Sequence, residues 1–152
     1  MQIFIGGGVK SAGSRAYLEN VALVLEEAGH QVFLPHRDGT LPGKTGNEQG
    51  LLTGADILGL GRWVFEGNLE CIRGCGAVVA VLDGLCWGTT MELGYAYAYK
   101  MLVKPDLIII GIYTDPVDVL DIMRFYACDE VLASLEALPT ALTRLATHLR
   151  GH

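Results

Sequence analysis

The sequence lacks the features that mark several large classes of protein. No apolar stretch approaches the roughly 20 residues of a membrane helix without a polar interruption. The first apolar run, residues 2–5, is too short for the core of a signal peptide and leads directly into glycines. Charged residues make up only 18% of the chain and the net charge is −6, which disfavours binding to a phosphate polymer. We therefore expect a cytoplasmic protein that binds neither a membrane nor a nucleic acid polymer.

Cysteine and histidine are also scarce, with four residues of each. Without a secretion signal, disulfide bonds are not expected. Cys71 and Cys75 lie one helical turn apart, a spacing that can present two thiols to a metal, but no pair of histidines lies near them. We interpret the cysteines as small buried core side chains and expect neither a metal nor a cofactor.

Apolar residues are abundant, at 51% of 152 residues, which is enough for the core of a single domain spanning residues 1–152. Short apolar runs alternate with helical periodicity, and a long polar loop with a short helix near residues 47–52 is expected at residues 35–60. This alternation predicts a flavodoxin-like α/β three-layer sandwich with a roughly five-stranded parallel sheet. The expected strands are residues 2–5, 31–34, 77–82, 107–112 and 130–132, and the expected helices are a segment ended by Gly29 and residues 62–73, 89–101, 116–126 and 138–149.

In parallel sheets of this kind, ligands bind beyond the carboxyl ends of the strands. Three segments follow such strand ends, namely residues 6–15, 83–92 and 113–123. We expect these segments to converge on one site.

The first of these segments combines glycines with cations. Gly6, Gly7 and Gly8 lie at a strand-to-helix turn, followed by Lys10 and Arg15. Glycines let backbone N–H groups approach an anion, and a helix N-terminus favours negative charge. The spacing matches neither a P-loop nor the dinucleotide fingerprint. An anion site and a tight turn with a solvated basic edge both fit this pattern.

The second segment carries an acidic residue at the expected ligand crevice. Glu92 follows the strand that ends near Asp83, and an acid in this place can reach the C1′ atom of a sugar. The spacing of Thr89 and Glu92 also fits a capping box, in which both side chains only close the end of a helix. Spacing alone leaves both interpretations open.

Five blocks of sequence resemble the nucleoside 2-deoxyribosyltransferase family, in order, from residue 3 to about residue 123. The block that follows the strand ending in Leu-Asp-Gly is the most specific of the five. The blocks are IFIGG (3–7), VFLPHRDG (32–39), VVAVLDG (78–84), GTTMELGYA (88–96) and IGIYTD (110–115).

The resemblance implies that Glu92 attacks C1′, that the base leaves, and that a second base then takes the sugar from the covalent glycosyl-enzyme. Asn68, at a position where the family often has an Asp that contacts the base, and Asp83 are the further catalytic candidates. The expected substrate is a small nucleoside or nucleotide with a free nucleobase. The substrate-binding candidates are Phe4, Gly6, Gly7, Lys10, Arg15, Cys86, Gly88, Thr89, Asp121 and Met123.

Several positions depart from the family pattern. Phe4 stands where members usually have a Tyr, and Cys86 stands where nucleoside-specific members have an Asp that binds the 5′-hydroxyl. Nucleotide-cleaving relatives have Ser at the latter position and basic residues in the glycine loop. Asp121 and Met123 resemble residues that a neighbouring subunit contributes to the pocket, which implies a homo-oligomer.

These departures leave more than one activity open. The expected function is nucleoside 2-deoxyribosyl transfer. Hydrolysis of a nucleoside 5′-monophosphate by an N-glycosidase is the nearest alternative, and lysine-decarboxylase-like phosphoribohydrolases share part of the signature. A non-catalytic nucleotide-binding sensor is a further alternative, which Phe4 favours.

Overall fold

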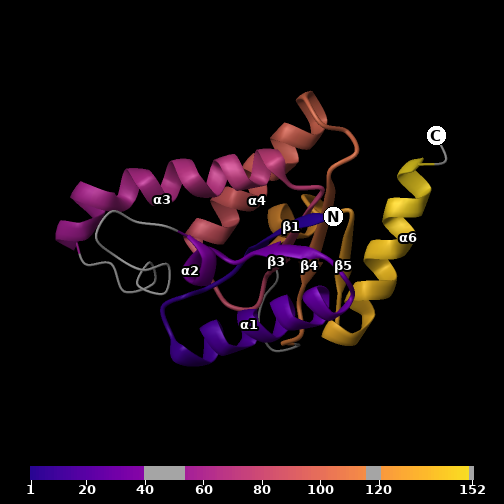
Figure 1. Cartoon of the computed structure of the whole chain (residues 1–152), viewed down its shortest axis with the longest axis horizontal. Helices are drawn as coiled ribbons and strands as arrows, with labels where there is room; N and C mark the ends of the chain where they lie inside the picture. Colours follow the sequence, from indigo (N-terminus) through magenta and orange to yellow (C-terminus); the bar gives the residue numbers. More distant parts are fainter. Residues whose placement is uncertain (40–53, 116–120, 151–152) are drawn as a thin grey trace.

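The computed structural model describes residues 1–39, 54–115 and 121–150, and within these ranges five strands form one sheet (Figure 1). The strand order is β2-β1-β3-β4-β5, and every neighbouring pair is parallel. This is the strand order of flavodoxin-like folds, with the reversal of winding between β1 and β3. The predicted fold class is confirmed. The strands are β1 Gln2–Gly6, β2 Gln31–Phe33, β3 Ala77–Val81, β4 Ile108–Ile112 and β5 Glu130–Leu132.

Helices cover both faces of the sheet and give three layers. Figure 1 shows α1 and α6 on one face and α3 and α4 on the other. No helix in the described ranges is both long and apolar enough to cross a membrane. The helices are α1 Ala12–Glu27, α2 Pro35–Asp38, α3 Gly54–Gly74, α4 Trp87–Leu102, α5 Ile122–Tyr126 and α6 Leu138–Arg150, with a 3-10 turn, η2, at Leu135–Ala137.

The central strands are buried on both faces, as their uninterrupted apolar sequences predict. Side chains alternate between the two cores because the period of a strand is two residues. Ile3 and Ile5 of β1 therefore pack with α1 and α6, whereas Phe4 packs in the core beneath α3 and α4. This alternation places Phe4 in the same layer as the helix that carries Glu92.

The predicted loop at residues 35–60 was wrong at both ends. A one-turn helix, α2, begins at Pro35, where the fixed backbone angle of proline favours a first helical position. The helix predicted at 62–73 begins earlier, at Gly54, although its first residues are rich in glycine. Intrinsic propensity is a weak guide, since tertiary context often overrides it. The short helix expected near residues 47–52 lies outside the described ranges. The helix expected at residues 116–126 corresponds to α5, Ile122–Tyr126, and its first five expected residues, 116–120, lie outside the described ranges.

Candidate active site

Glu92 lies in the second turn of α4, which begins two residues earlier than its sequence predicts. The N-cap is Cys86, which makes no side-chain capping bond, and Thr89 is the third residue inside the helix. The capping-box interpretation of Thr89 and Glu92 is therefore wrong. The hydroxyl of Thr89 is buried without a hydrogen-bond partner among the described residues, and the carboxylate of Glu92 bonds to Asn68 instead of the helix N-terminus.

The carboxylate of Glu92 meets α3 and the end of β1. Nδ2 of Asn68 donates a hydrogen bond of 2.8 Å to Oε1 of Glu92. The other oxygen, Oε2, lies over Gly6, where an added Cβ would approach it to 3.1 Å. The absence of a side chain at Gly6 thus makes room for the carboxylate. The structure brings together Glu92, Asn68 and Gly6 from three different elements.

Burial controls the charge of this carboxyl group. Protein atoms surround most of it, and the loss of hydration raises the pKa of Glu92 from its ordinary value of 4.5 to about 7. The hydrogen bond from Asn68 lowers the pKa and so partly offsets this effect. At neutral pH the group therefore exists in both protonation states. Strongly shifted groups of this kind in a cleft are typical of functional sites.

A small cavity of about 110 Å³ opens beside Glu92. Most of its wall is apolar, and the first turn of α4 closes one side. This combination places a carboxylate in a largely apolar pocket at the carboxyl edge of a parallel sheet. The lining residues are Ile5, Gly7, Val9, Leu18, Pro35, Asn68, Cys86, Gly88, Thr89 and Glu92.

The glycine loop approaches this cavity, but its two cations do not line it. Nη1 of Arg15 donates a bond of 2.7 Å to the carbonyl oxygen of Val9, and Lys10 is exposed. Gly7 packs so closely on α1 that a Cβ would lie 2.4 Å from Cδ2 of Leu18. Arg15 therefore supports the loop rather than the cavity wall.

Two further candidates do not line the Glu92 cavity, although Phe4 lies close to Gly6. Asp83 accepts hydrogen bonds from N and Oγ1 of Thr114, at 2.7 and 2.8 Å, and from N of Asp115 at 2.9 Å. It lines a separate cavity of about 200 Å³ and ties the end of β3 to the segment after β4. Phe4 is fully buried, stacks on Phe33 with ring centroids 6.0 Å apart, and is not among the described residues that line the Glu92 cavity.

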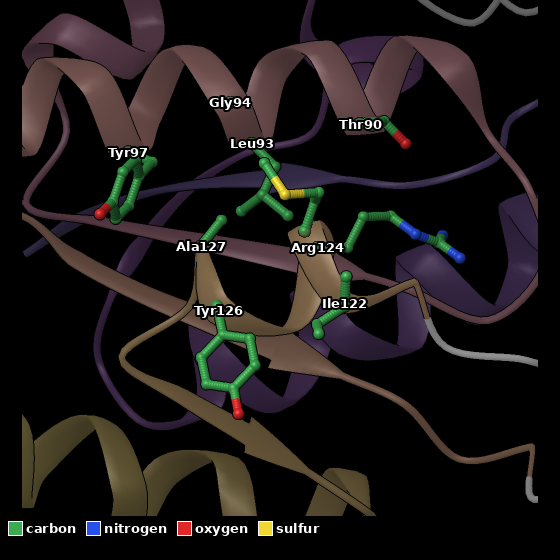
Figure 2. Close-up of a pocket in the computed structure, with 9 residues that line it drawn as sticks. Thr90, Leu93, Gly94, Tyr97, Ile122, Arg124, Tyr126 and Ala127 are labelled. Carbon is green, nitrogen blue, oxygen red and sulfur yellow. The ribbon is translucent and has the colours of Figure 1, made fainter.

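Asp121 and Met123 lie on α5, beside a different hollow. Oδ1 of Asp121 caps α5 by accepting bonds from the backbone N–H groups of Met123 and Arg124. Met123 is 76% exposed and borders an apolar groove of about 490 Å³ between α4 and α5. Figure 2 shows Leu93 and Tyr97 of α4 pointing towards α5, where Ala127 lies opposite Leu93 and the ring of Tyr126 points away from α4. The motifs did not indicate this groove, although exposed apolar residues on both helices were a possible signal.

Comparisons with known proteins agree with this fold. The sequence model of the family described as nucleoside 2-deoxyribosyltransferase matches residues 3–115. A 2-deoxyribosyltransferase from Bacillus psychrosaccharolyticus superposes with a TM-score of 0.69 at 16% identity, over 91% of this chain and 90% of that chain. A pilus assembly-related protein from Burkholderia pseudomallei gives a TM-score of 0.54 at 16% identity, over 97% and 90%. A CMP N-glycosidase from Clostridium botulinum gives 0.49 at 13% identity, over 95% and 98%.

No curated protein sequence matches this chain. The family match nevertheless extends over well over half of the chain, from β1 to the segment after β4, and includes Glu92, Asn68 and Gly6. The solved neighbours show that the fold is shared. The chain belongs to the nucleoside 2-deoxyribosyltransferase family.

Proposed function

We propose that this protein transfers a 2-deoxyribosyl group between nucleobases, with Glu92 as the nucleophile. The observation that carries the proposal is the Glu92 carboxylate, held by Asn68 over Gly6 at the carboxyl edge of the sheet. A carboxylate nucleophile divides one difficult substitution into two easier ones. Asn68 occupies Oε1 and leaves Oε2 as the attacking oxygen.

The reaction then runs in two displacements at C1′. In the first, Oε2 forms a bond to C1′ while the bond from C1′ to the base nitrogen breaks, and the leaving base takes the electron pair and a proton from solvent. In the second, a nitrogen of another base attacks C1′ and releases its proton to solvent, and the Glu92 carboxylate leaves with the electron pair of its bond to C1′. Two inversions retain the configuration of the sugar.

The apolar walls of the cavity favour transfer over hydrolysis. Ile5, Val9, Leu18 and Pro35 line the cavity beside the carboxylate, and we expect their apolar side chains to limit the water that reaches a glycosyl-enzyme held there. A positively charged transition state is also stabilised more strongly beside an ionised Glu92 in such a low-dielectric site. Hydrolysis of a nucleoside 5′-monophosphate has less support, because Lys10 and Arg15 lie outside the described cavity lining.

The base has a neighbouring place to lie. A groove of about 600 Å³ between α2 and α3 shares Asn68 with the Glu92 cavity, and Phe33 and Trp63 supply aromatic walls. A nucleoside with its sugar beside Glu92 can therefore extend its base into this groove. Aromatic side chains suit a planar base.

We also propose that the active form is a homo-oligomer. The apolar groove between α4 and α5 is flanked by exposed side chains of Ile122, Met123 and Tyr126. A second copy that covered this groove would remove these side chains from water.

The test is to incubate the protein with one 2′-deoxynucleoside and a second free base, and to separate the products by chromatography. Exchange is expected for the wild type, and Glu92→Gln should lower turnover by several orders of magnitude because the nucleophile is lost. Glu27→Gln, which changes an exposed glutamate of α1, is the matched control and should keep full activity.

Other outcomes identify the alternatives. Release of free base without exchange indicates a hydrolase, and binding without turnover indicates a sensor. Retention of more than about a tenth of wild-type activity by Glu92→Gln would exclude Glu92 as the nucleophile.

A further inference from the structure

The short helix α5 contributes a buried cation to the loop that precedes α4. Arg124 is only 6% exposed, although Met123 before it is 76% exposed. Its Nη1 atom donates two hydrogen bonds, of 3.0 Å to the carbonyl oxygen of Leu82 and 2.9 Å to that of Gly84. In Figure 2 the guanidinium of Arg124 points away from the end of the groove occupied by Tyr97 and Ala127. The side chain therefore crosses from α5 to the end of β3.

Stability alone does not explain this buried charge. Within the described residues no carboxylate forms an ion pair with Arg124, and its Nε atom is buried without a hydrogen-bond partner. A buried, incompletely paired cation loses hydration that its remaining contacts only partly replace. Replacing such a buried charge with an apolar side chain of similar size often leaves the protein equally stable or makes it more stable.

What Arg124 holds is the loop at residues 82–86, and this loop determines where α4 begins. Gly84 has a φ of +72°, in the region that glycine adopts freely. A glycine can adopt many other backbone angles, so contacts from neighbouring elements are needed to hold this loop in one conformation. Asp83 anchors the loop to the segment after β4, through Thr114, and Arg124 anchors it from α5. Two elements thus restrain one glycine-containing turn.

The end of this loop enters the proposed site. Cys86 lines the cavity beside Glu92 and is also the N-cap of α4. Its carbonyl oxygen accepts bonds of 3.0 Å from the backbone N–H and from Oγ1 of Thr90. A change in the loop therefore moves the first turn of α4, and with it the position of Glu92 relative to Asn68.

We propose that Arg124 is a positioning residue that fixes the loop at residues 82–86 and thereby holds Glu92 in line for attack on the sugar. This role rests on the proposed glycosyl transfer. Arg124 acts through the loop and is not among the described residues that line the cavity beside Glu92. Small displacements of reacting groups lower rates strongly, so the effect belongs to kcat rather than to binding.

The experiment compares Arg124→Met and Arg124→Lys with the wild type in three measurements: kcat and KM for base exchange, the thermal midpoint Tm, and the rate at which iodoacetamide labels Cys86, read by peptide mass mapping. For Arg124→Met we expect kcat to fall at least about tenfold with KM within about threefold. Cys86 labelling should become several times faster, while Tm changes little. Arg124→Lys should lie between the two, because an ammonium group reaches only part of the carbonyl pair.

Leu142→Ala, on the opposite face of the sheet, is the control for stability. It should lower Tm while leaving kcat and Cys86 labelling close to wild type. An unchanged labelling rate in Arg124→Met would overturn the proposal, and so would a loss of kcat that only follows the loss of Tm. If Arg124→Met does not fold, the same comparison is made with Arg124→Lys, which keeps the buried charge.

The labelling measurement separates this proposal from the proposed function. A wild type without base exchange would overturn the proposed function, and the anchored loop would then be judged by Cys86 labelling alone. Faster labelling in the variant would still show that Arg124 fixes the loop. Without base exchange, however, Arg124 could not be said to position a nucleophile, because the reaction would be absent.

Discussion

In the proposed reaction, a single proton decides whether Glu92 can act as the nucleophile, because only an ionised carboxylate can attack C1′. Burial raises the pKa of this group to about 7. We therefore expect kcat/KM to rise about tenfold per pH unit below this value and to level off about one unit above it. Initial rates across pH 5 to 9 test this prediction. A rise of kcat/KM centred near pH 4.5, the ordinary pKa of a glutamate, would show that the carboxylate is solvated and differently placed.

The same shift predicts an effect on stability, with a defined sign. The pKa of Glu92 is about 7 in the folded protein and near 4.5 in the unfolded chain, so the folded state binds a proton more readily. Ionisation therefore destabilises the fold progressively as the pH rises from 4.5 to 7, and the full effect is present above 7. Glu92→Gln removes this effect and should be more stable than wild type at pH 8, by on the order of 3 kcal/mol, but not at pH 4. Denaturant unfolding of both proteins at the two pH values measures this difference.

Phe4 offers a test of how the carboxylate is held. Its Cε1 atom lies 3.6 Å from the place where a Cβ on Gly6 would sit, and Oε2 of Glu92 lies 3.1 Å from that place. A tyrosine hydroxyl introduced here would extend into the same region and donate to the carboxylate. We predict that Phe4→Tyr shifts the rise of kcat/KM to lower pH, because a hydrogen bond donated to the carboxylate lowers its pKa. We also predict that it changes the ratio of kcat/KM for matched deoxyribo- and ribonucleosides. We also predict measurable wild-type activity on both sugars, since a site without a polar contact to one hydroxyl discriminates only ~100-fold or less.

If both the ratio and the pH at which kcat/KM rises stay unchanged in Phe4→Tyr, Phe4 is a core residue and nothing more. The full burial of Phe4 and its stacking on Phe33 are consistent with that purely structural role. The free energy of unfolding would then fall, because the added hydroxyl would be buried without a partner.

At the scale of elements, the loop between β1 and α1 is held by close packing. A Cβ at Gly7 would lie 2.4 Å from Cδ2 of Leu18, which is itself buried in the core. Gly7→Ala should therefore displace the loop and lower the free energy of unfolding by about 1–3 kcal/mol. Gly13, in the first turn of α1, has no atom within 4 Å of an added Cβ. Gly13→Ala should stabilise the protein by up to ~1 kcal/mol, and equal destabilisation by both changes would contradict the packing argument.

The elements also show which parts of the structure sequence patterns predict. Apolar runs without polar breaks located β3 and β4, because strands buried on both faces leave no other pattern. The start of α4 was misplaced, since Thr89 and Glu92 have capping-box spacing while the actual N-cap, Cys86, is not a residue type that caps prefer. Local preferences describe what a side chain can do, whereas the packing of α4 on the sheet decides where the helix starts.

The site shows the same division. Glu92 was predicted because it lies in a specific sequence block, and Gly6 because it follows a strand. Asn68 was predicted from the family resemblance, but its contact with Glu92 joins residues 24 positions apart, on α3 and α4, so no local pattern encodes the contact itself. Arg124 was missed for a related reason. It lies on a five-residue helix with exposed neighbours, and only the folded chain shows that it is buried against β3.

At the scale of the whole molecule, the exposed apolar surface on α4 and α5 is the feature that a single copy leaves unexplained. Trp87 and Met91 on α4, and Ile122, Met123 and Tyr126 on α5, are all more than half exposed. Ile122, Met123 and Tyr126 gather at one groove, and exposed apolar side chains gathered in this way are typical of protein–protein interfaces. The net charge of −6 opposes the association of two copies, so burial of apolar side chains has to provide the favourable free energy.

We therefore predict that the wild type elutes as a dimer or larger oligomer in size-exclusion chromatography with light scattering, and that Ile122→Asp shifts it toward the monomer. A carboxylate buried in an apolar interface without a partner costs several kcal/mol, which is enough to dissociate most assemblies. Leu23→Asp is the matched control, because Leu23 is 51% exposed but lies on α1, away from the groove. If a neighbouring copy completes the pocket, base exchange should fall together with assembly in Ile122→Asp and recover at higher protein concentration. A fully active wild-type monomer at assay concentration would exclude both the interface and a pocket shared between copies.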